Sequence, residues 1–307
     1  MIIKEKKSWL RMVFAIRGSA LPNIWPRIVV VLLVSVITVA ASYAGHLKFT
    51  LTPVPFTVVG LAIAIFLGFR NNAAYDRYWE GRKLWGALVN VSRNFAIQSR
   101  VIKSHDNDPA ARERLIRMII GYVHCLRHRL RKSVPDQELN LFLGEGVATQ
   151  VSSFRNIPVA ILDKVTELLV QHWRSGNLET YQLNSLQADL SKMLDVQGGC
   201  ERIQATPIPF TYSVLTHRTV VLYCLALPFG LHDTVGWATP FVAAFVSYAF
   251  FALDDLGDEI EQPFGLQPNS LPLHAITRTI EIDLLTLAGT NESDLPDPIV
   301  AIDNILY

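Results

Sequence analysis

The 307-residue sequence has few cysteines and little charge, and both shortages narrow what it can be. Its three cysteines, Cys125, Cys200 and Cys224, form no CxxC pair, which argues against a disulfide framework. The sequence also lacks a nucleophile elbow, a Walker loop, an HExxH pair and a glycine-rich nucleotide fingerprint, so neither an enzyme active site nor a cofactor is expected. A net charge of +1 offers no overall attraction to nucleic acid.

Charge is scarce above all in four long stretches, which we interpret as membrane-spanning helices at about residues 27–45, 49–69, 207–231 and 235–253. Short links at 46–48 and 232–234 close them into two hairpins. His217 and Arg218 interrupt the third span, and a basic pair there needs water, a partner or a shallow depth. Four membrane spans and the lack of an enzyme motif favour a transport protein over an enzyme.

The second span continues beyond its apolar part. The sequence turns polar at Arg70, yet no helix-breaking residues follow until 104–109. One helix is therefore predicted from near Pro55 to near Lys103, about 75 Å long at about 1.5 Å per residue. Its first part would lie in lipid and the rest in water.

Basic residues flank the first two spans on one side only. They are Lys4, Lys6, Lys7, Arg11, Arg17 and Arg27 before the first span, and Arg70, Arg77, Arg82 and Lys83 after the second. The intervening tip carries only Lys48. The positive-inside rule therefore predicts that the N-terminus, the region of about 70–205 and the tail 254–307 are cytoplasmic. The first apolar run is too long for a cleavable signal.

The polar part is predicted to be helical, and no segment alternates with a period of two, so the fold class is all-α. One helix begins with Asp108 as its N-cap and Pro109 in its first turn. Others run from Asn156 to Gly176 and from about Leu178 to Gly198. The buried stripe of the first is predicted to be Leu115, Ile119, Tyr122, Leu126 and Leu130.

Charge is divided unevenly over the polar part. Residues 70–132 carry fourteen Lys or Arg against five Asp or Glu, whereas residues 254–307 carry eleven Asp or Glu and one Arg. Two interpretations remain open. Each region is a solvated surface, or the acidic tail packs along the basic helices of its own or a neighbouring subunit.

Leu61, Ile65 and Phe69 share one face of the second span near its cytoplasmic end. Every membrane helix is apolar, so this face could simply contact lipid. Gly60, Ala62, Ala64 and Gly68, however, let neighbouring helices approach closely. If several copies surround an axis, the three large side chains form rings, and such a constriction gates by dewetting.

Other candidates lie outside the second span. Asp254, Asp258 and Glu261 share a helical face and could hold a divalent cation, or pair with the basic helices. His124, Cys125 and His128 resemble half a metal site, with an ordinary helix surface as the alternative. Tyr181 faces away from the leucine stripe of its own helix, which is predicted to be Leu183, Leu186, Leu190 and Leu194.

Several motifs, in order, resemble the bestrophin family and specifically its bacterial branch. They are Trp9 with Arg17-Gly18-Ser19, residues 66–72, Arg77-Tyr78-Trp79 with Trp85, residues 199–203, residues 206–210 and residues 259–265. The resemblance covers most of the chain. It implies a homopentameric ion channel in a bacterial inner membrane, with one bestrophin-like unit over residues 1–307. Its partners would be copies of itself, membrane lipid and inorganic ions.

The resemblance also implies roles for residues. The three neck positions of the family fall on Leu61, Ile65 and Phe69, and its cytoplasmic aperture falls on Tyr181. Animal relatives bind calcium through an acidic run after Pro-Phe-Gly, but residues 266–270 of this chain contain no carboxylate, which speaks against calcium gating.

The expected function is a pentameric channel for monovalent cations, especially sodium. This chain resembles the bacterial bestrophins, which look selective for cations, whereas animal bestrophins pass chloride. An anion channel of the same fold is the alternative. A secondary transporter would normally need inverted repeats or broken helices, and a membrane-anchored scaffold or enzyme would carry no current.

Overall fold

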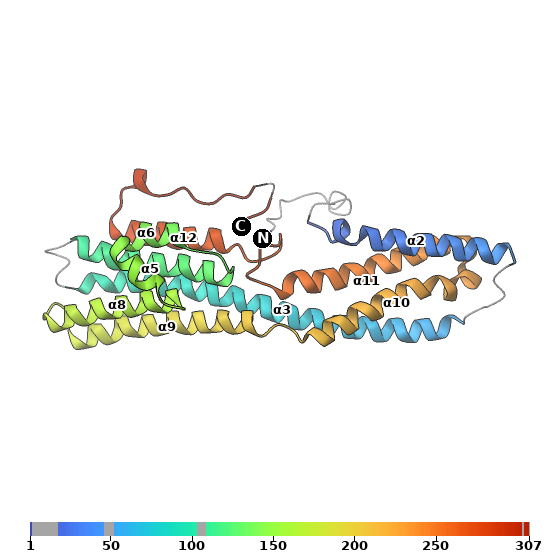
Figure 1. Ribbon diagram of the computed structural model, residues 1–307, viewed down its shortest axis with the longest axis horizontal. Coiled ribbons are helices and arrows are strands. Elements are labelled where there is room, and N and C mark those ends of the chain that lie inside the picture. The colour runs from blue at the N-terminus through green and yellow to red at the C-terminus, as the bar shows by residue number, and fades with distance from the viewer. Residues whose placement is uncertain (2–17, 46–51, 103–108, 303, 307) are drawn as a thin grey trace. The chain divides into compact units, whose positions relative to one another are not determined.

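The computed structural model describes Met1 and residues 18–45, 52–102, 109–302 and 304–306, and these residues are mostly helical (Figure 1). The helices are α2 (Leu21–Tyr43), α3 (Pro53–Gln98), α5 (Pro109–Leu130), α6 (Asp136–Leu143), α7 (Glu145–Ser152), α8 (Ile157–Arg174), α9 (Thr180–Ala205), α10 (Phe210–Val235), α11 (Thr239–Glu261) and α12 (Leu273–Ala288). Within this described part there is no β-strand, and a single isolated bridge joins Ile302 to Ile305. The all-α prediction is confirmed.

Helix α3 is one continuous helix of 46 residues (Figure 1). At about 1.5 Å per residue it is about 69 Å long. It starts at Pro53, where a missing N–H removes no intrahelical hydrogen bond. It passes into a 3₁₀ turn, Ser99–Val101, before the predicted end at Lys103, which lies outside the described residues.

Three segments are long and apolar enough to cross a membrane: Leu21–Tyr43, Pro53–Val101 and Phe210–Glu261. The last of these contains both α10 and α11, which the 3₁₀ turn Gly236–Ala238 separates. The four predicted spans therefore correspond to α2, the first part of α3, α10 and α11.

The link between the last two spans is not where the sequence predicts it. We expected a turn at 232–234, but α10 continues through His232 to Val235. Gly236 has a φ of +56°, which glycine adopts without steric cost, and Pro240 lies in the first turn of α11. The glycine, and not the polar residues before it, ends the helix. The other predicted link, at 46–48, the basic N-terminal residues 4–17 and the predicted N-cap Asp108 lie outside the described residues.

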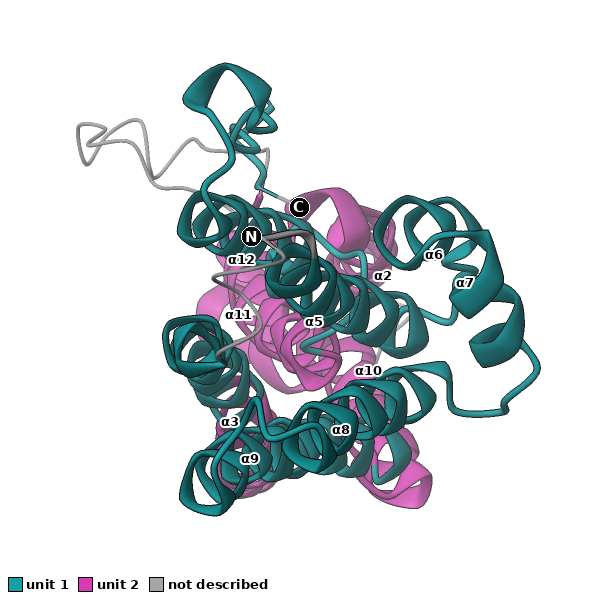
Figure 2. Ribbon diagram, turned by 90° about the vertical axis from the view of Figure 1, so that its left-hand side faces the viewer, with its two compact units in different colours: residues 1–3, 79–206, 263–307 teal, residues 4–78, 207–262 magenta. Residues whose placement is uncertain are grey.

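The chain divides into two compact units (Figure 2). Unit 2 contains α2, the part of α3 up to Tyr78, α10 and α11. Unit 1 contains the rest of α3, helices α5 to α9, and α12. Each unit is therefore assembled from segments that are far apart in the sequence.

Unit 2 has an apolar core to which all four of its helices contribute. The core consists of Ile24 and Val31 from α2, Ile63 and Leu67 from α3, Val220, Cys224 and Leu227 from α10, and Ala243 and Phe251 from α11. Helix α2 packs against both α10 and α11. The core therefore sets which side of α3 turns inward.

Unit 1 is organised around α5, which packs against α6, α8 and α12. Every member of its predicted stripe is buried. Within the stripe, the Tyr122 hydroxyl donates a hydrogen bond to the Met193 carbonyl at 2.8 Å. Helices α6, α7 and α12 were not predicted individually.

The acidic tail packs on basic helices of its own unit. Asp283 of α12 accepts a hydrogen bond from Arg93 Nη2 at 2.6 Å, and Glu281 lies 3.1 Å from His124 Nε2. Among the two interpretations of the charge distribution, these contacts support packing within one subunit.

Candidate functional site

The predicted neck face of α3 is exposed in this chain. The side chains of Leu61, Ile65 and Phe69 are 64%, 49% and 64% exposed. Apolar side chains of this size on one face need lipid, another protein surface or a pore beside them. The structure thus leaves the face available, and its role in a neck remains a prediction.

The opposite side of α3 explains why these three side chains point outward. Ile63 and Leu67 are buried in the core of unit 2. Gly60 lies so close to the Tyr223 side chain of α10 that an added Cβ would stand 3.0 Å from its Cζ atom. Close packing on this side sets the rotation of α3 about its axis. It directs the face formed by Leu61, Ile65 and Phe69, here called the Leu61 face, away from the bundle of unit 2.

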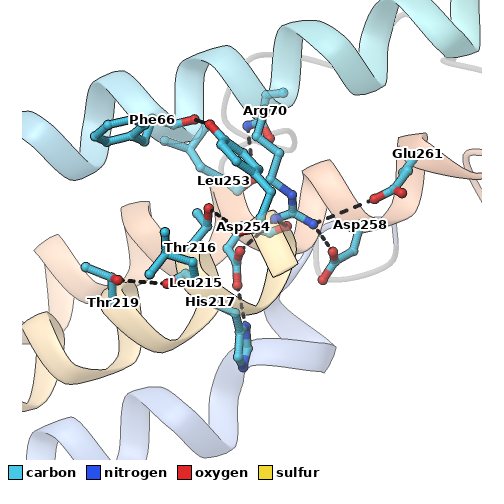
Figure 3. Close-up of polar contacts among 12 residues, drawn as sticks. Phe66, Arg70, Leu215, Thr216, His217, Thr219, Leu253, Asp254, Asp258 and Glu261 are labelled. Carbon is cyan, nitrogen blue, oxygen red and sulfur yellow. Dashed lines mark hydrogen bonds and ion pairs between the residues drawn. The ribbon is translucent and has the colours of Figure 1, made fainter. Parts of the chain in front are cut away.

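One residue beyond Phe69, Arg70 is buried among carboxylates (Figure 3). Its Nη1 donates to Asp254 Oδ1 at 2.8 Å, and its Nη2 donates to Asp258 Oδ1. Glu261 Oε2 lies 4.0 Å from the same Nη2. The side chain of Arg70 is 1% exposed, so its charge is balanced by protein groups and not by bulk water.

Asp254 joins all four helices of unit 2. Its side chain is fully buried, and besides Arg70 of α3 it meets His217 Nδ1 of α10 at 2.7 Å and Arg27 Nη1 of α2 at 4.0 Å. His217, which interrupts the third span, therefore has a charged partner. Removing one member of a buried ion pair costs about 3–5 kcal/mol, because the other charge stays buried and uncompensated.

Two further hydrogen bonds hold α3 beside the cluster (Figure 3). The Tyr212 hydroxyl of α10 donates to the Phe66 carbonyl at 3.0 Å, and the Asn71 amide donates to the Leu253 carbonyl of α11 at 3.0 Å. The end of the predicted neck is thus tied to both helices of the second hairpin.

The three acidic candidates on α11 surround Arg70 in this structure. Asp254 and Asp258 form ion pairs with its guanidinium, which corresponds to the alternative of pairing with basic side chains. Glu261 also accepts a hydrogen bond from the Ile208 amide at 3.0 Å. Among the described residues, no group of three or more His, Cys, Asp or Glu is arranged to hold a metal. The cation hypothesis for these residues stays untested.

Tyr181 lies in the first turn of α9 and is 71% exposed. A capping box between Glu179 and Gln182 fixes this end of the helix. Leu183, Leu186 and Leu190 are buried as predicted, but Leu194 is exposed and Met193 takes its place. The difference reflects the packing of the whole helix: at about 100° per residue, Met193 lies near the centre of all the residues of α9 that are buried, whereas Leu194 lies more than about 90° from it.

A second polar cluster joins α5, α6 and α12 in unit 1. Burial lowers the pKa of His124 although Glu281 opposes the shift, and burial with nearby Arg127 lowers the pKa of His274 to about 4. His128 binds Glu138 at 3.0 Å, and Cys125 is a buried free thiol. His124 and His128 therefore pair with different carboxylates, those of Glu281 and Glu138.

The fold and the site define a helical membrane protein in which an apolar face is held outward beside a buried charge cluster. The family model described as Bacterial/Fungal Bestrophin protein matches residues 1–286. The chain belongs to the bestrophin family, as the motifs predict.

Relatives align along nearly the whole chain. A protein of Salmonella typhi named voltage-dependent anion channel-forming protein YneE is 40% identical over 96% of both chains. The Escherichia coli protein of that name is 40% identical over 98% of this chain and 97% of its own. A voltage-dependent anion channel-forming protein of Ralstonia nicotianae is 38% identical over 94% and 95%.

Solved structures agree with the fold. A crystal structure of a bacterial bestrophin homologue from Klebsiella pneumoniae superposes with a TM-score of 0.83. It is 36% identical and covers 87% of this chain and 99% of its own. A point variant of that homologue superposes with a TM-score of 0.82 over the same shares.

Proposed function

We propose that the chain forms a homopentameric ion channel in a bacterial inner membrane, with both termini in the cytoplasm. Copies of α3 surround the axis, and Leu61, Ile65 and Phe69 line a hydrophobic neck. Tyr181 lines a second constriction at the cytoplasmic exit. Lipid surrounds the spans, and inorganic ions are what the protein transports.

The observation that carries this proposal is the outward face of α3. Its three large apolar side chains are exposed, while Ile63 and Leu67 on the other side are buried in the core. A ring of copies turns such a face into a narrow apolar passage. Water leaves a passage of this kind readily, so it stops ions until it is wetted.

The proposed permeant ions are monovalent cations, especially sodium. Neutral neck rings do not select by charge, so the preference has to come from charged groups outside the neck. The alternative is an anion channel, and the names of the relatives from Salmonella, Escherichia and Ralstonia favour it.

Bilayer recording of the purified full-length protein tests the proposal. Under a NaCl gradient we expect the reversal potential to shift toward the sodium equilibrium potential. A shift toward the chloride potential would support the anion alternative. Absence of any conductance would overturn the channel proposal, and saturable, stoichiometrically coupled flux would indicate a transporter.

Native mass spectrometry in detergent tests the number of copies. It should give five copies, and a monomer or dimer would contradict the pentamer.

A further inference from the structure

Asp76 lies on the same face of α3 as the proposed neck. At about 100° per residue, it lies within about 20° of the centre of the face formed by Leu61, Ile65 and Phe69. Asn72 is on this face as well, but it carries no charge. Asp76 is therefore the first charged side chain on this face after the apolar stretch, about two turns beyond Phe69.

The Asp76 side chain is exposed. It makes no hydrogen bond or ion pair with any residue that the structure describes. The neighbouring Arg77 points elsewhere, since its Nε donates to the Glu261 carbonyl at 3.4 Å. An exposed carboxylate without a structural contact is available to ions in solution.

Nearby basic groups do not offset this charge. Arg70 is neutralised by Asp254 and Asp258, and its side chain is buried on the other side of α3. Lys83 is on the same face but about two turns further along α3. At a salt concentration of 0.1 M the screening length is about 10 Å, which is about the distance along α3 from Asp76 to Phe69, whereas Lys83 lies about twice as far away.

We infer that Asp76 is a charge-selecting residue, whose copies form an acidic ring that favours cations at the cytoplasmic side of the neck. The inference rests on the proposed channel function and deepens it. Rings of Asp or Glu select cations in other channels. In water, one charge about 10 Å from an ion changes its local concentration about twofold. With screening at 0.1 M, five copies raise the local concentration of a monovalent cation about three- to fourfold and lower that of a monovalent anion by the same factor.

The experiment compares the sodium-to-chloride permeability ratio of full-length variants in planar bilayers. Asp76→Asn should lower the ratio about tenfold at 0.1 M salt, because the acidic ring attracts sodium and repels chloride by the same factor. Asp76→Glu keeps the charge and should stay near the wild-type value, whereas Asp76→Lys should lower the ratio further. Asn72→Asp adds a second carboxylate to the face and should raise it. Each difference should shrink at 1 M salt, where the screening length falls to about 3 Å.

The outcomes separate this inference from the proposed function. An unchanged ratio in both Asp76→Asn and Asp76→Lys, with normal conductance, would overturn the role of Asp76 and leave the channel proposal intact. A wild type selective for chloride, with the same fall in Asp76→Asn, would support Asp76 and overturn cation preference. A wild type without conductance would overturn both.

Discussion

At the scale of single residues, the rotation of α3 decides which apolar side chains are structural. Leu67 and Phe69 are both apolar and stand two positions apart, yet one is fully buried and the other is exposed. Hydrophobicity therefore does not tell them apart. The two residues differ in their contact with the core of unit 2, which Leu67 makes and Phe69 does not. The Leu61 face is therefore free to contact something outside the bundle.

Replacing Leu61, Ile65 and Phe69 together by Ala should increase single-channel current or open probability. Smaller side chains widen the proposed neck and make it easier to wet. Single-channel recording measures the effect. Leu33→Ala/Ile37→Ala is the matched control, because these exposed apolar residues lie on α2 and outside the proposed pore. Wild-type conductance and gating in the triple variant would rule out these residues as the gate.

Tyr181→Ala should change conductance or ion preference without changing the oligomer. The side chain is exposed and faces away from the buried leucines of its helix, so its loss leaves the core intact. Recording and native mass spectrometry together measure both properties. Phe154→Ala, at another exposed aromatic residue, serves as the control. Dissociation of the oligomer in Tyr181→Ala would instead indicate a packing role.

At the scale of helices, the Arg70 cluster attaches α3 to its three neighbours in unit 2. The buried carboxylate of Asp254 contacts one basic side chain on each of α2, α3 and α10. Gly257 of α11 allows this arrangement, because a Cβ there would clash with the side-chain oxygen of Asn71. The orientation of the proposed neck thus depends on polar contacts next to it.

Arg70→Met should lower the free energy of unfolding by about 3–5 kcal/mol, because it removes the closest counter-charge of the buried Asp254 carboxylate. Asp254→Asn should also destabilise, and the double variant should lose less than the sum by about 1–3 kcal/mol. Thermal unfolding in detergent measures all three. Arg218→Met, which removes an exposed arginine of α10, should change stability by less than about 0.5 kcal/mol. Additive losses would show that the two residues act independently.

At the scale of the whole molecule, acid should weaken the fold through unit 1. His274 has a folded pKa of about 4 because burial and Arg127 disfavour its charged form. An unfolded histidine titrates near about 6.5. Between these values the unfolded state binds more protons, so stability is lost as pH falls from about 6.5 to about 4.

His274→Gln removes this proton uptake and should flatten the decline in melting temperature over that pH range. Melting curves of the full-length protein in detergent at pH 7, 6, 5 and 4 measure it. The carboxyl of Glu138 extends the decline below about pH 4.5: burial raises its pKa, but His128 and Arg127 outweigh burial and lower it, so its stabilising charge is lost only in more acidic solution. An identical pH profile for wild type and His274→Gln would contradict the role of His274.

Much of the fold was predictable because helices follow local rules. The period of about 3.6 residues identified the buried stripe of α5, and apolar length identified the four spans. The absence of helix breakers indicated that α3 continues past Arg70. Each of these properties depends on residues within a few turns of one another, so a single sequence is enough to recognise them.

Contacts between distant residues were decided only by the tertiary structure. Nothing near Arg70 in the sequence specifies Asp254 as its partner, and nothing near Leu194 indicates that the buried side of α9 shifts to Met193. The turn at Gly236 likewise replaced the more polar residues 232–234. Such choices depend on which surfaces meet when helices pack. The sequence alone therefore established the apolar face of α3, and packing decided that this face turns outward.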